Sequence, residues 1–159
     1  TMLTHSLHGI PSDCFDPTGK SMSDLYFIVN AIDGLQSGTY VLHQEKQALE
    51  LLRAGHFRYE AGHLALDQEL GMDAAVNIYF MVNLEPVLAR FGNRGYRVAQ
   101  LEAATIAGKL YLAAYALGLG ATGLTFFDDE VTAFFSPHTA GKSVMFLIAL
   151  GHPFKRARR

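Results

Sequence analysis

The last five residues of the chain concentrate positive charge. They include Lys155, Arg156, Arg158 and Arg159, although the formal net charge of the whole 159-residue chain is −2. The rest of the chain is therefore acidic, and the positive charge is local. Guanidinium and ammonium groups bind phosphate oxygens well, so this tail could clamp one anionic ligand. A frayed, solvated terminus is the alternative interpretation.

Glycines at positions 118, 120 and 123 spell the pattern G-x-G-x-x-G. A dinucleotide-binding fingerprint needs this pattern between a strand and a following helix. Here the apolar periodicity predicts the opposite order, a helix, then the glycines, then a strand. The pattern therefore favours a helix cap followed by a strand whose glycines let a ligand approach the backbone.

Other polar residues give weaker signals. Asp128, Asp129 and Glu130 could support acid–base chemistry, but acidic side chains at a helix start also suit the free N–H groups and the macrodipole. None of the seven histidines has the spacing of a helical zinc pair, so we predict no metal site. The single cysteine, Cys14, and the lack of an apolar leader suggest a cytoplasmic protein. The net charge gives no indication of a nucleic-acid or membrane partner.

A long helix from Tyr96 to Leu117 should organise the fold. Apolar and small residues cover most of its circumference, which a helix exposed on one face would not tolerate. We therefore expect this helix to be buried, or half-buried and covered by a second copy of the chain. It should end at Gly118, and Leu124–Phe127 should form a strand. The uncharged run across this turn is broken by glycines, which argues against a membrane span.

The other elements predict an α+β fold. Residues 1–24 should form an irregular lead-in, and the segments on either side of Asp33-Gly34 should form a hairpin. The segment 47–53 could be a short helix or a strand. Strands are predicted at 25–30, 38–42, 74–82 and 143–150, and helices at 58–70, 84–91 and 128–135.

Two segments carry a family resemblance, LYFIVNAIDGLQSGTYVLHQEKQALELL and GNRGYRVAQLEAATIAGKLYLAAYALGLGATGLTFFDDEV. In the order of its hairpin, R-G-Y-R turn, long helix, A-L-G-L-G turn and F-D-D helix start, the chain resembles flavin-dependent nitroreductase-like proteins. It looks most similar to the azoline-oxidising dehydrogenase branch, and to the C-terminal half of tandem, two-domain members. The resemblance implies a nitroreductase-like sandwich at residues 25–153, with a central antiparallel or mixed sheet flanked by helices. It also implies that the family's N-terminal helices are missing, and that residues 154–159 form a basic tail.

The resemblance further implies an FMN-dependent oxidoreductase of nitroreductase or dehydrogenase type that acts on a small molecule or a peptide azoline. Such a protein would be a homodimer or pseudo-dimer through the 96–118 helix. Carried across by position, one group of residues would lie along the flavin ring and a second group would hold its phosphate. These groups are Gly123, Leu124, Thr125 and Phe126, and Lys155, Arg156 or Arg158, respectively.

Several features depart from the family pattern. The arginine-rich N-terminal helix is absent from these residues, and Phe126 stands where a glycine is usual. Arg90-Phe91 replaces the Lys-Tyr pair common in the azoline-oxidising branch, and Gly108-Lys109 replaces a Gln-Asn pair. These departures leave open a second function, a degenerate, non-catalytic domain that serves as a dimerisation or scaffold half. A charge at Ala107 or Ala114 should then disrupt the dimer.

Overall fold

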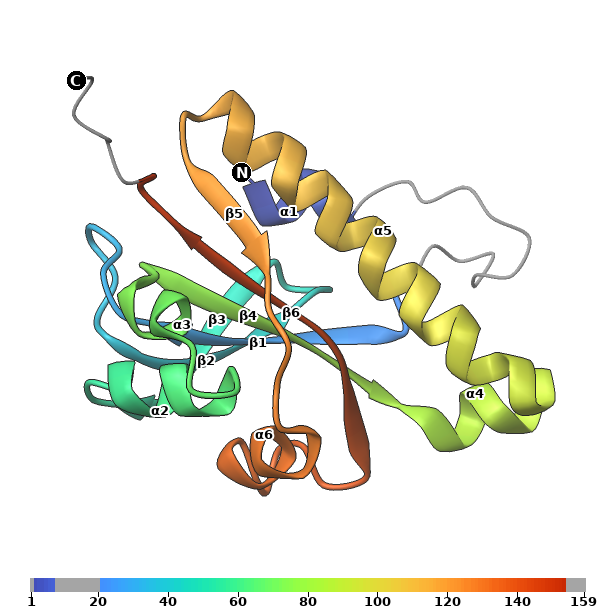
Figure 1. Cartoon of the computed structure of the whole chain (residues 1–159). Coiled ribbons are helices and arrows are strands. Elements are labelled where there is room, and N and C mark those ends of the chain that lie inside the picture. The colour runs from blue at the N-terminus through green and yellow to red at the C-terminus, as the bar shows by residue number, and fades with distance from the viewer. Residues whose placement is uncertain (1, 8–20, 154–159) are drawn as a thin grey trace.

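A computed structural model describes residues 2–7 and 21–153 of the chain. Its centre is a six-stranded antiparallel sheet with the strand order β3-β2-β1-β4-β6-β5. Helices lie on both faces of this sheet, as Figure 1 shows, so the predicted α+β sandwich is confirmed. The strands are β1 (Ser23–Val29), β2 (Gly38–His43), β3 (Ala48–Ala54), β4 (Val76–Asn83), β5 (Gly120–Gly123) and β6 (Lys142–Gly151).

The predicted hairpin and central strand are confirmed. β1 and β2 pair antiparallel, with Phe27 opposite Tyr40. β4 lies between β1 and β6, and seven of its eight residues are buried, because helices cover both of its faces. The ambiguous segment 47–53 is largely a strand, β3, at the edge of the sheet.

One face of the sheet is covered by α5 (Gly95–Ala116), together with α1 (Met2–Leu7), α4 (Leu84–Phe91) and the short 3-10 helix η1 (Gly92–Arg94). The helix α5 ends as predicted, because Gly118 takes a φ of +70°. Its inward side chains pack in the same apolar cluster as residues of β1, β4 and β6. These inward residues are Ala99, Ala103, Ile106, Ala107, Leu110 and Ala114.

The outer side of α5 is also apolar but is exposed. Leu112 and Tyr115 are 73% and 85% exposed, and Gly108, about one turn before Leu112, has open space where a side chain would start. The expectation of a half-buried helix is therefore confirmed. Ala107 and Ala114, however, are buried in the chain's own core, so the prediction that a charge at either would report on a dimer interface was wrong. No helix in the described ranges is long and apolar enough to cross a membrane.

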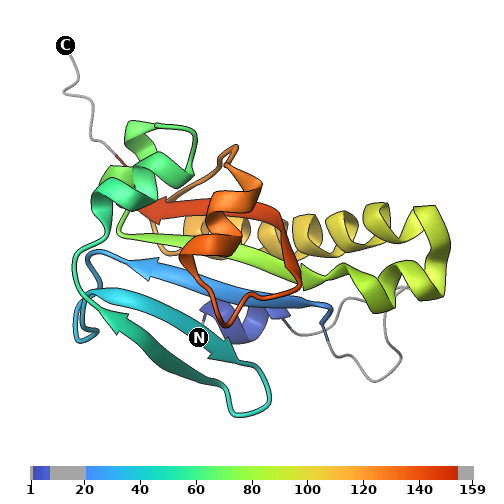
Figure 2. The ribbon, with the colours of Figure 1, turned by 90° about the horizontal axis from the view of Figure 1, so that it is seen from below.

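The opposite face carries α2 (Arg58–Leu64), α3 (Glu69–Asp73) and α6 (Asp128–Phe134), which lie in front of the sheet in Figure 2. The predicted single helix over 58–70 is interrupted after Leu64. Leu66 and Asp67 both have a φ of +56°, which no α-helix can contain. The α6 start is confirmed at Asp128, but no side chain caps it, so its acidic first turn favours the helix through the macrodipole rather than through a capping hydrogen bond.

Two predictions were wrong in position. Met2–Leu7 form α1 and pack against α5, so the expected irregular lead-in contains a helix; residues 8–20 lie outside the described part. The strand expected at Leu124–Phe127 lies earlier, at β5. Glycine is a poor strand former, but pairing of Gly120–Gly123 with β6 overrides that preference. The Leu124 N–H donates to the Leu147 carbonyl (3.1 Å), after which the chain turns toward α6.

A buried carboxylate ties α5 to the start of β1. Glu102 is 2% exposed and accepts hydrogen bonds from the Met22 N–H, the Ser23 N–H and the Ser23 hydroxyl, each at 2.9 Å. Three donors satisfy the carboxylate where water cannot reach it. Glu102 therefore fixes where the chain enters the sheet.

Candidate functional site

The candidate site begins at β5, an edge strand of the sheet. Gly120 lies opposite Gly151, and Thr122 lies opposite Ala149. Because successive N–H groups of an antiparallel strand point to opposite edges, the N–H groups of Ala121 and Gly123 point away from β6. The glycine-rich strand thus offers backbone donors along an edge that no other described strand covers.

Residues 124–127, here called the wall segment, continue from β5 toward α6. The side chains of Leu124 and Phe126 pack against the apolar cluster beneath α2 and α6, whereas Thr125 is exposed. The N–H groups of Thr125 and Phe126 have no hydrogen-bond partner among the described residues. Phe126 stands where a glycine is usual. Its side chain nevertheless contacts this cluster, and its N–H remains available as a hydrogen-bond donor.

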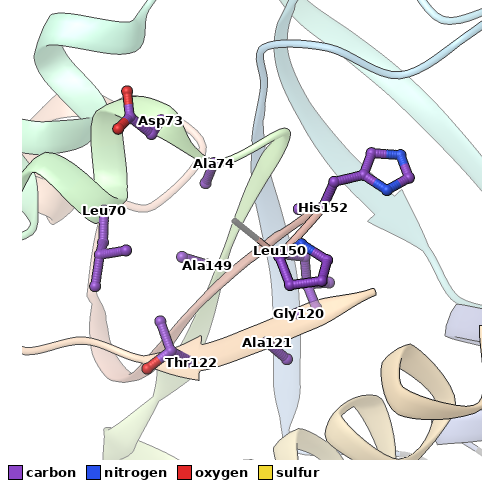
Figure 3. Close-up of a pocket in the computed structure, with 11 residues that line it drawn as sticks. Leu70, Asp73, Ala74, Gly120, Ala121, Thr122, Ala149, Leu150 and His152 are labelled. Atoms are coloured by element: carbon purple, nitrogen blue, oxygen red, sulfur yellow. The ribbon is translucent and has the colours of Figure 1, made fainter. Parts of the chain in front are cut away.

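A pocket of about 280 Å³ lies beside β5, between α3 and the end of β6 (Figure 3). Among its described lining residues, Asp73 is the only carboxylate and no lysine or arginine is present. Its border includes Pro153, two residues before Lys155. The lining residues are Leu70, Asp73, Ala74, Gly120, Ala121, Thr122, Ala149, Leu150, Gly151, His152 and Pro153.

The predicted site residues form two groups, and the Arg90-Phe91 pair, noted as a departure from the family pattern, is separate from both. Gly123, Leu124, Thr125 and Phe126 are contiguous at the end of β5 and the start of the wall segment. The predicted phosphate ligands, Lys155, Arg156 and Arg158, lie outside the described residues. The Arg90-Phe91 pair lies elsewhere, beside a separate cavity of about 260 Å³.

The Arg90 guanidinium stacks on the ring of Phe91, with its carbon 4.6 Å from the ring centroid. Asp24 and Asn83 line the same cavity. No residue of β5 or of the wall segment is among the residues that line it. Within one copy of the chain, the position that corresponds to the Lys-Tyr pair is therefore not part of the candidate site.

Gln68 and His63 contact the candidate site or its support, and the sequence did not reveal either role. The Gln68 amide nitrogen donates to the Thr125 hydroxyl (3.1 Å) and to the Ala65 carbonyl (2.6 Å). The His63 ring lies between Asp67 and Glu130, with each nitrogen 2.8 Å from a carboxylate oxygen. The only signal in the sequence was the four-residue spacing of His63 and Asp67, because Glu130 comes 67 residues later.

The hydrogen bonds that the His63 ring makes to the Asp67 and Glu130 carboxylates raise the pKa of His63 above its usual value. Burial opposes this shift but is outweighed. The described residues contain no group of three or more histidine, cysteine, aspartate or glutamate side chains that could hold a metal ion. The site thus consists of the backbone donors of the wall segment and the pocket at β5, and it is supported by the ionisable contact of His63 with Asp67 and Glu130.

Comparison with protein-family profiles matches residues 31–152 to the Nitroreductase family. The chain belongs to the nitroreductase family. The matched range contains the wall segment and every described pocket residue except Pro153. It also contains α5, which covers one face of the sheet.

Two similar proteins of this family are longer than this chain. The curated "Putative nitroreductase MJ1384" of Methanocaldococcus jannaschii is 27% identical over 109 residues, which are 68% of this chain and 55% of that protein. The crystal structure of a "putative nitroreductase" from Anabaena variabilis has a TM-score of 0.86 at 30% identity, over 96% of this chain and 32% of that one. The chain therefore spans about half the length of the first and about a third of the second.

A third similar structure is the E. coli microcin synthetase McbBCD complex with truncated pro-MccB17 bound. Its TM-score is 0.76 at 16% identity, over 96% of this chain and 61% of the matched chain. At this identity the similarity shows a common fold alone.

Proposed function

We propose that this chain forms the flavin-binding part of an FMN-dependent oxidoreductase of nitroreductase or dehydrogenase type. Members of the nitroreductase family are generally FMN-dependent oxidoreductases. The observation that carries the proposal is the wall segment, where the N–H groups of Thr125 and Phe126 are unpaired among the described residues. This segment directly follows β5, whose residues Gly120, Ala121 and Thr122 line the pocket. Free backbone donors on the same stretch of chain as a partly apolar pocket suit a flat ring with polar edges.

The described residues fit the ring end of FMN. The N–H groups of Gly123, Thr125 and Phe126 would bind the ring edge, while the Leu124 N–H stays bonded to Leu147 and the packing of Phe126 keeps the segment in place. Bound FMN would supply hydride or electron transfer, while the chain would orient the cofactor and exclude water from it. The described pocket lining contains no lysine or arginine that could bind a phosphate. We therefore assign phosphate binding to Lys155, Arg156 or Arg158.

The substrate class that we propose is a small molecule or a peptide azoline. The azoline alternative is supported by the sequence resemblance and by the fold shared with the microcin synthetase complex. Oxidation of an azoline to an azole removes a hydride and a proton, which requires a base. The guanidinium of Arg90 stays protonated at neutral pH and cannot be that base. Within the proposal, a base for azoline oxidation would have to come from Asp73 or His152, which line the pocket at β5.

A second candidate function is a non-catalytic dimerisation or scaffold domain. The exposed apolar stripe of α5 favours it, because a stripe of this length on a soluble protein is usually covered by a partner. Homodimer or pseudo-dimer contact through this helix is compatible with either function. The stripe comprises Leu101, Ala104, Gly108, Leu112 and Tyr115.

A titration with FMN, in which binding is monitored by the quenching of flavin fluorescence, distinguishes the flavin-binding function from the scaffold function. Ala121→Phe places a ring in the pocket at β5 and should weaken FMN binding by about tenfold or more, equivalent to ~1.4 kcal/mol. Ala133→Phe adds the same volume at an exposed position of α6 and should leave binding unchanged. FMN binding that is equal in both variants would contradict the assigned site. Binding by neither variant nor the unmodified chain would favour the scaffold function.

A further inference from the structure

The wall segment is held in place from one corner of the fold, residues 63–68, between α2 and α3. The Phe127 N–H donates to the Leu64 carbonyl at 3.1 Å. Gln68 donates to the hydroxyl of Thr125. Through Glu130 on the first turn of α6, His63 holds the element that directly follows the segment. The position of the wall segment therefore depends on the conformation of this corner.

The corner has an unfavourable backbone conformation. Leu66 and Asp67 are consecutive residues with φ of +56°, in the left-handed region that side chains other than glycine rarely adopt. Three contacts hold this turn closed. The Asp67 N–H donates to the His63 carbonyl (3.2 Å), the Gln68 amide donates to the Ala65 carbonyl, and the Asp67 carboxylate contacts the His63 ring. Losing one of them should loosen the turn.

The His63 contacts require a charged ring. An ionised carboxylate only accepts hydrogen bonds, so both ring nitrogens must carry a proton to satisfy Asp67 and Glu130 together. The ring also packs on Phe127 of the wall segment, with centroids 5.4 Å apart. A neutral ring can donate to only one of the two carboxylates. Deprotonation thus releases either the strained turn or α6.

The other ionisable groups near this ring lie on the same two helices. Glu60 is on the first turn of α2, and Asp128 and Asp129 share the first turn of α6 with Glu130. Within the described part of the chain, His63 forms ion pairs with Asp67 and Glu130 and with none of these three. Arg58 of α2 donates to the Met72 carbonyl instead. The charge state of His63 is therefore governed by its two partners.

We propose that His63 is a positioning residue of the flavin site, which in its charged form joins α2 to α6 and holds the wall segment in the geometry that binds FMN. This inference rests on the proposed function. His63 itself touches neither the proposed ring position nor the pocket lining. Its removal should weaken FMN binding at a pH where the wild-type ring is charged, and should have no effect where the ring is neutral.

The test compares FMN dissociation constants of the full chain and of His63→Gln between pH 6 and pH 9. The variant should bind roughly two- to fivefold more weakly at pH 6, in line with exposed ion pairs, and the ratio should approach one at pH 9. Using the ratio removes the titration of FMN itself. His56→Gln is the matched control, because His56 is an exposed histidine just before α2 and should give a ratio of one throughout.

Glu130→Gln gives a sharper second variant. The amide oxygen can still accept from the ring, but the negative charge that raises the pKa of His63 is gone. The His63→Gln effect, measured in this background, should therefore disappear at a lower pH than in the wild-type chain. A ratio that is one at every pH, or that does not change with pH, would overturn the positioning role.

Amide hydrogen exchange at Phe127 tests the same inference without flavin. Because this N–H donates to Leu64 across the corner, it should exchange faster in His63→Gln than in the wild type at pH 6, and equally at pH 9. If the wild type binds no FMN, the proposed function fails and this exchange rate decides the inference alone. Equal exchange in both proteins at pH 6 would overturn it.

Discussion

The two faces of the sheet are held by different forces. The helix α5 covers its face with alanine, leucine and isoleucine side chains, and among the described residues buried there Glu102, with its hydrogen bonds satisfied, is the only charged one. On the opposite face, α2 and α6 also bury an apolar cluster, but exposed or half-exposed charges border it, in particular His63 with Glu130, Lys142 with Asp24, and Arg53. The first face is therefore fixed by burial, whereas the second face, which supports the wall segment, also has ionisable contacts at its border, and we expect its stability to depend on pH.

The largest contrast should come from two charges placed on opposite sides of α5. Ala107 is 1% exposed, so Ala107→Glu buries an unpaired carboxylate and should destabilise the fold by ~3–5 kcal/mol. Leu112→Glu adds the same charge on the exposed side and should leave the melting temperature nearly unchanged. If the stripe is an interface, analytical ultracentrifugation should show that Leu112→Glu is monomeric. A variant that keeps the oligomeric state of the wild type would remove the stripe from consideration.

The next largest effect should follow removal of the buried carboxylate. Glu102→Ala removes the acceptor of three hydrogen bonds from Met22 and Ser23 and should cost about 3 kcal/mol, because among the described residues only the Ser23 N–H has a second acceptor, the Ser21 hydroxyl at 3.1 Å. Gln100→Ala, at an exposed position of the same helix, is the control and should cost well under ~1 kcal/mol. Urea denaturation measures both. Similar midpoints for the two variants would show that Glu102 does not anchor β1.

Two tyrosines on the α6 face should respond in opposite directions. The Tyr26 hydroxyl donates to the His138 carbonyl and accepts from Lys142, so Tyr26→Phe should destabilise by about 1 kcal/mol. The Tyr79 hydroxyl is buried without a partner in the described residues, and burial raises its pKa. Tyr79→Phe should therefore be neutral or stabilising by up to ~1 kcal/mol. Thermal melts measure both variants. A melting temperature that falls as much in Tyr79→Phe as in Tyr26→Phe would contradict this prediction.

The smallest effect concerns the pH dependence of stability at His63. Its partners raise the folded-state pKa, so its contribution is fully present below the unfolded value of about 6.5 and is lost as the pH rises through the folded value. The melting temperature of the wild type should exceed that of His63→Gln at pH 6, and the difference should vanish at high pH. If the difference in melting temperature grew with pH, the charged form of His63 could not be the form that stabilises the fold.

The sequence predicted the elements better than it predicted the contacts between them. Apolar patterns located α5, β4 and β6, because α5 is apolar on its exposed side as well as its buried side, and β4 and β6 are buried along most of their length. It misplaced β5, since four residues of G-A-T-G carry no strand preference and depend on β6 for their conformation. It could not show which alanines of α5 face inward, because small residues surround the whole helix.

The candidate site was predicted only where it is contiguous in the chain. Gly123 to Phe126 could be named from a resemblance, and within this range the N–H groups of Thr125 and Phe126 have no partner among the described residues. Their binding of a flavin stays a prediction. The support from His63 and Gln68 joins residues about 60 positions apart across a turn with positive φ, and no local pattern encodes it. Long-range polar contacts of this kind become visible only in three dimensions.

The most direct test of the central claim, that this chain binds FMN at the β5 edge, is an absorbance spectrum. The chain is mixed with FMN, desalted and scanned across the visible flavin bands, with Ala121→Phe treated in parallel. We expect the wild type to retain a flavin band and Ala121→Phe to lose most of it. A wild-type chain that emerges colourless, or a variant that retains as much flavin as the wild type, would contradict the account.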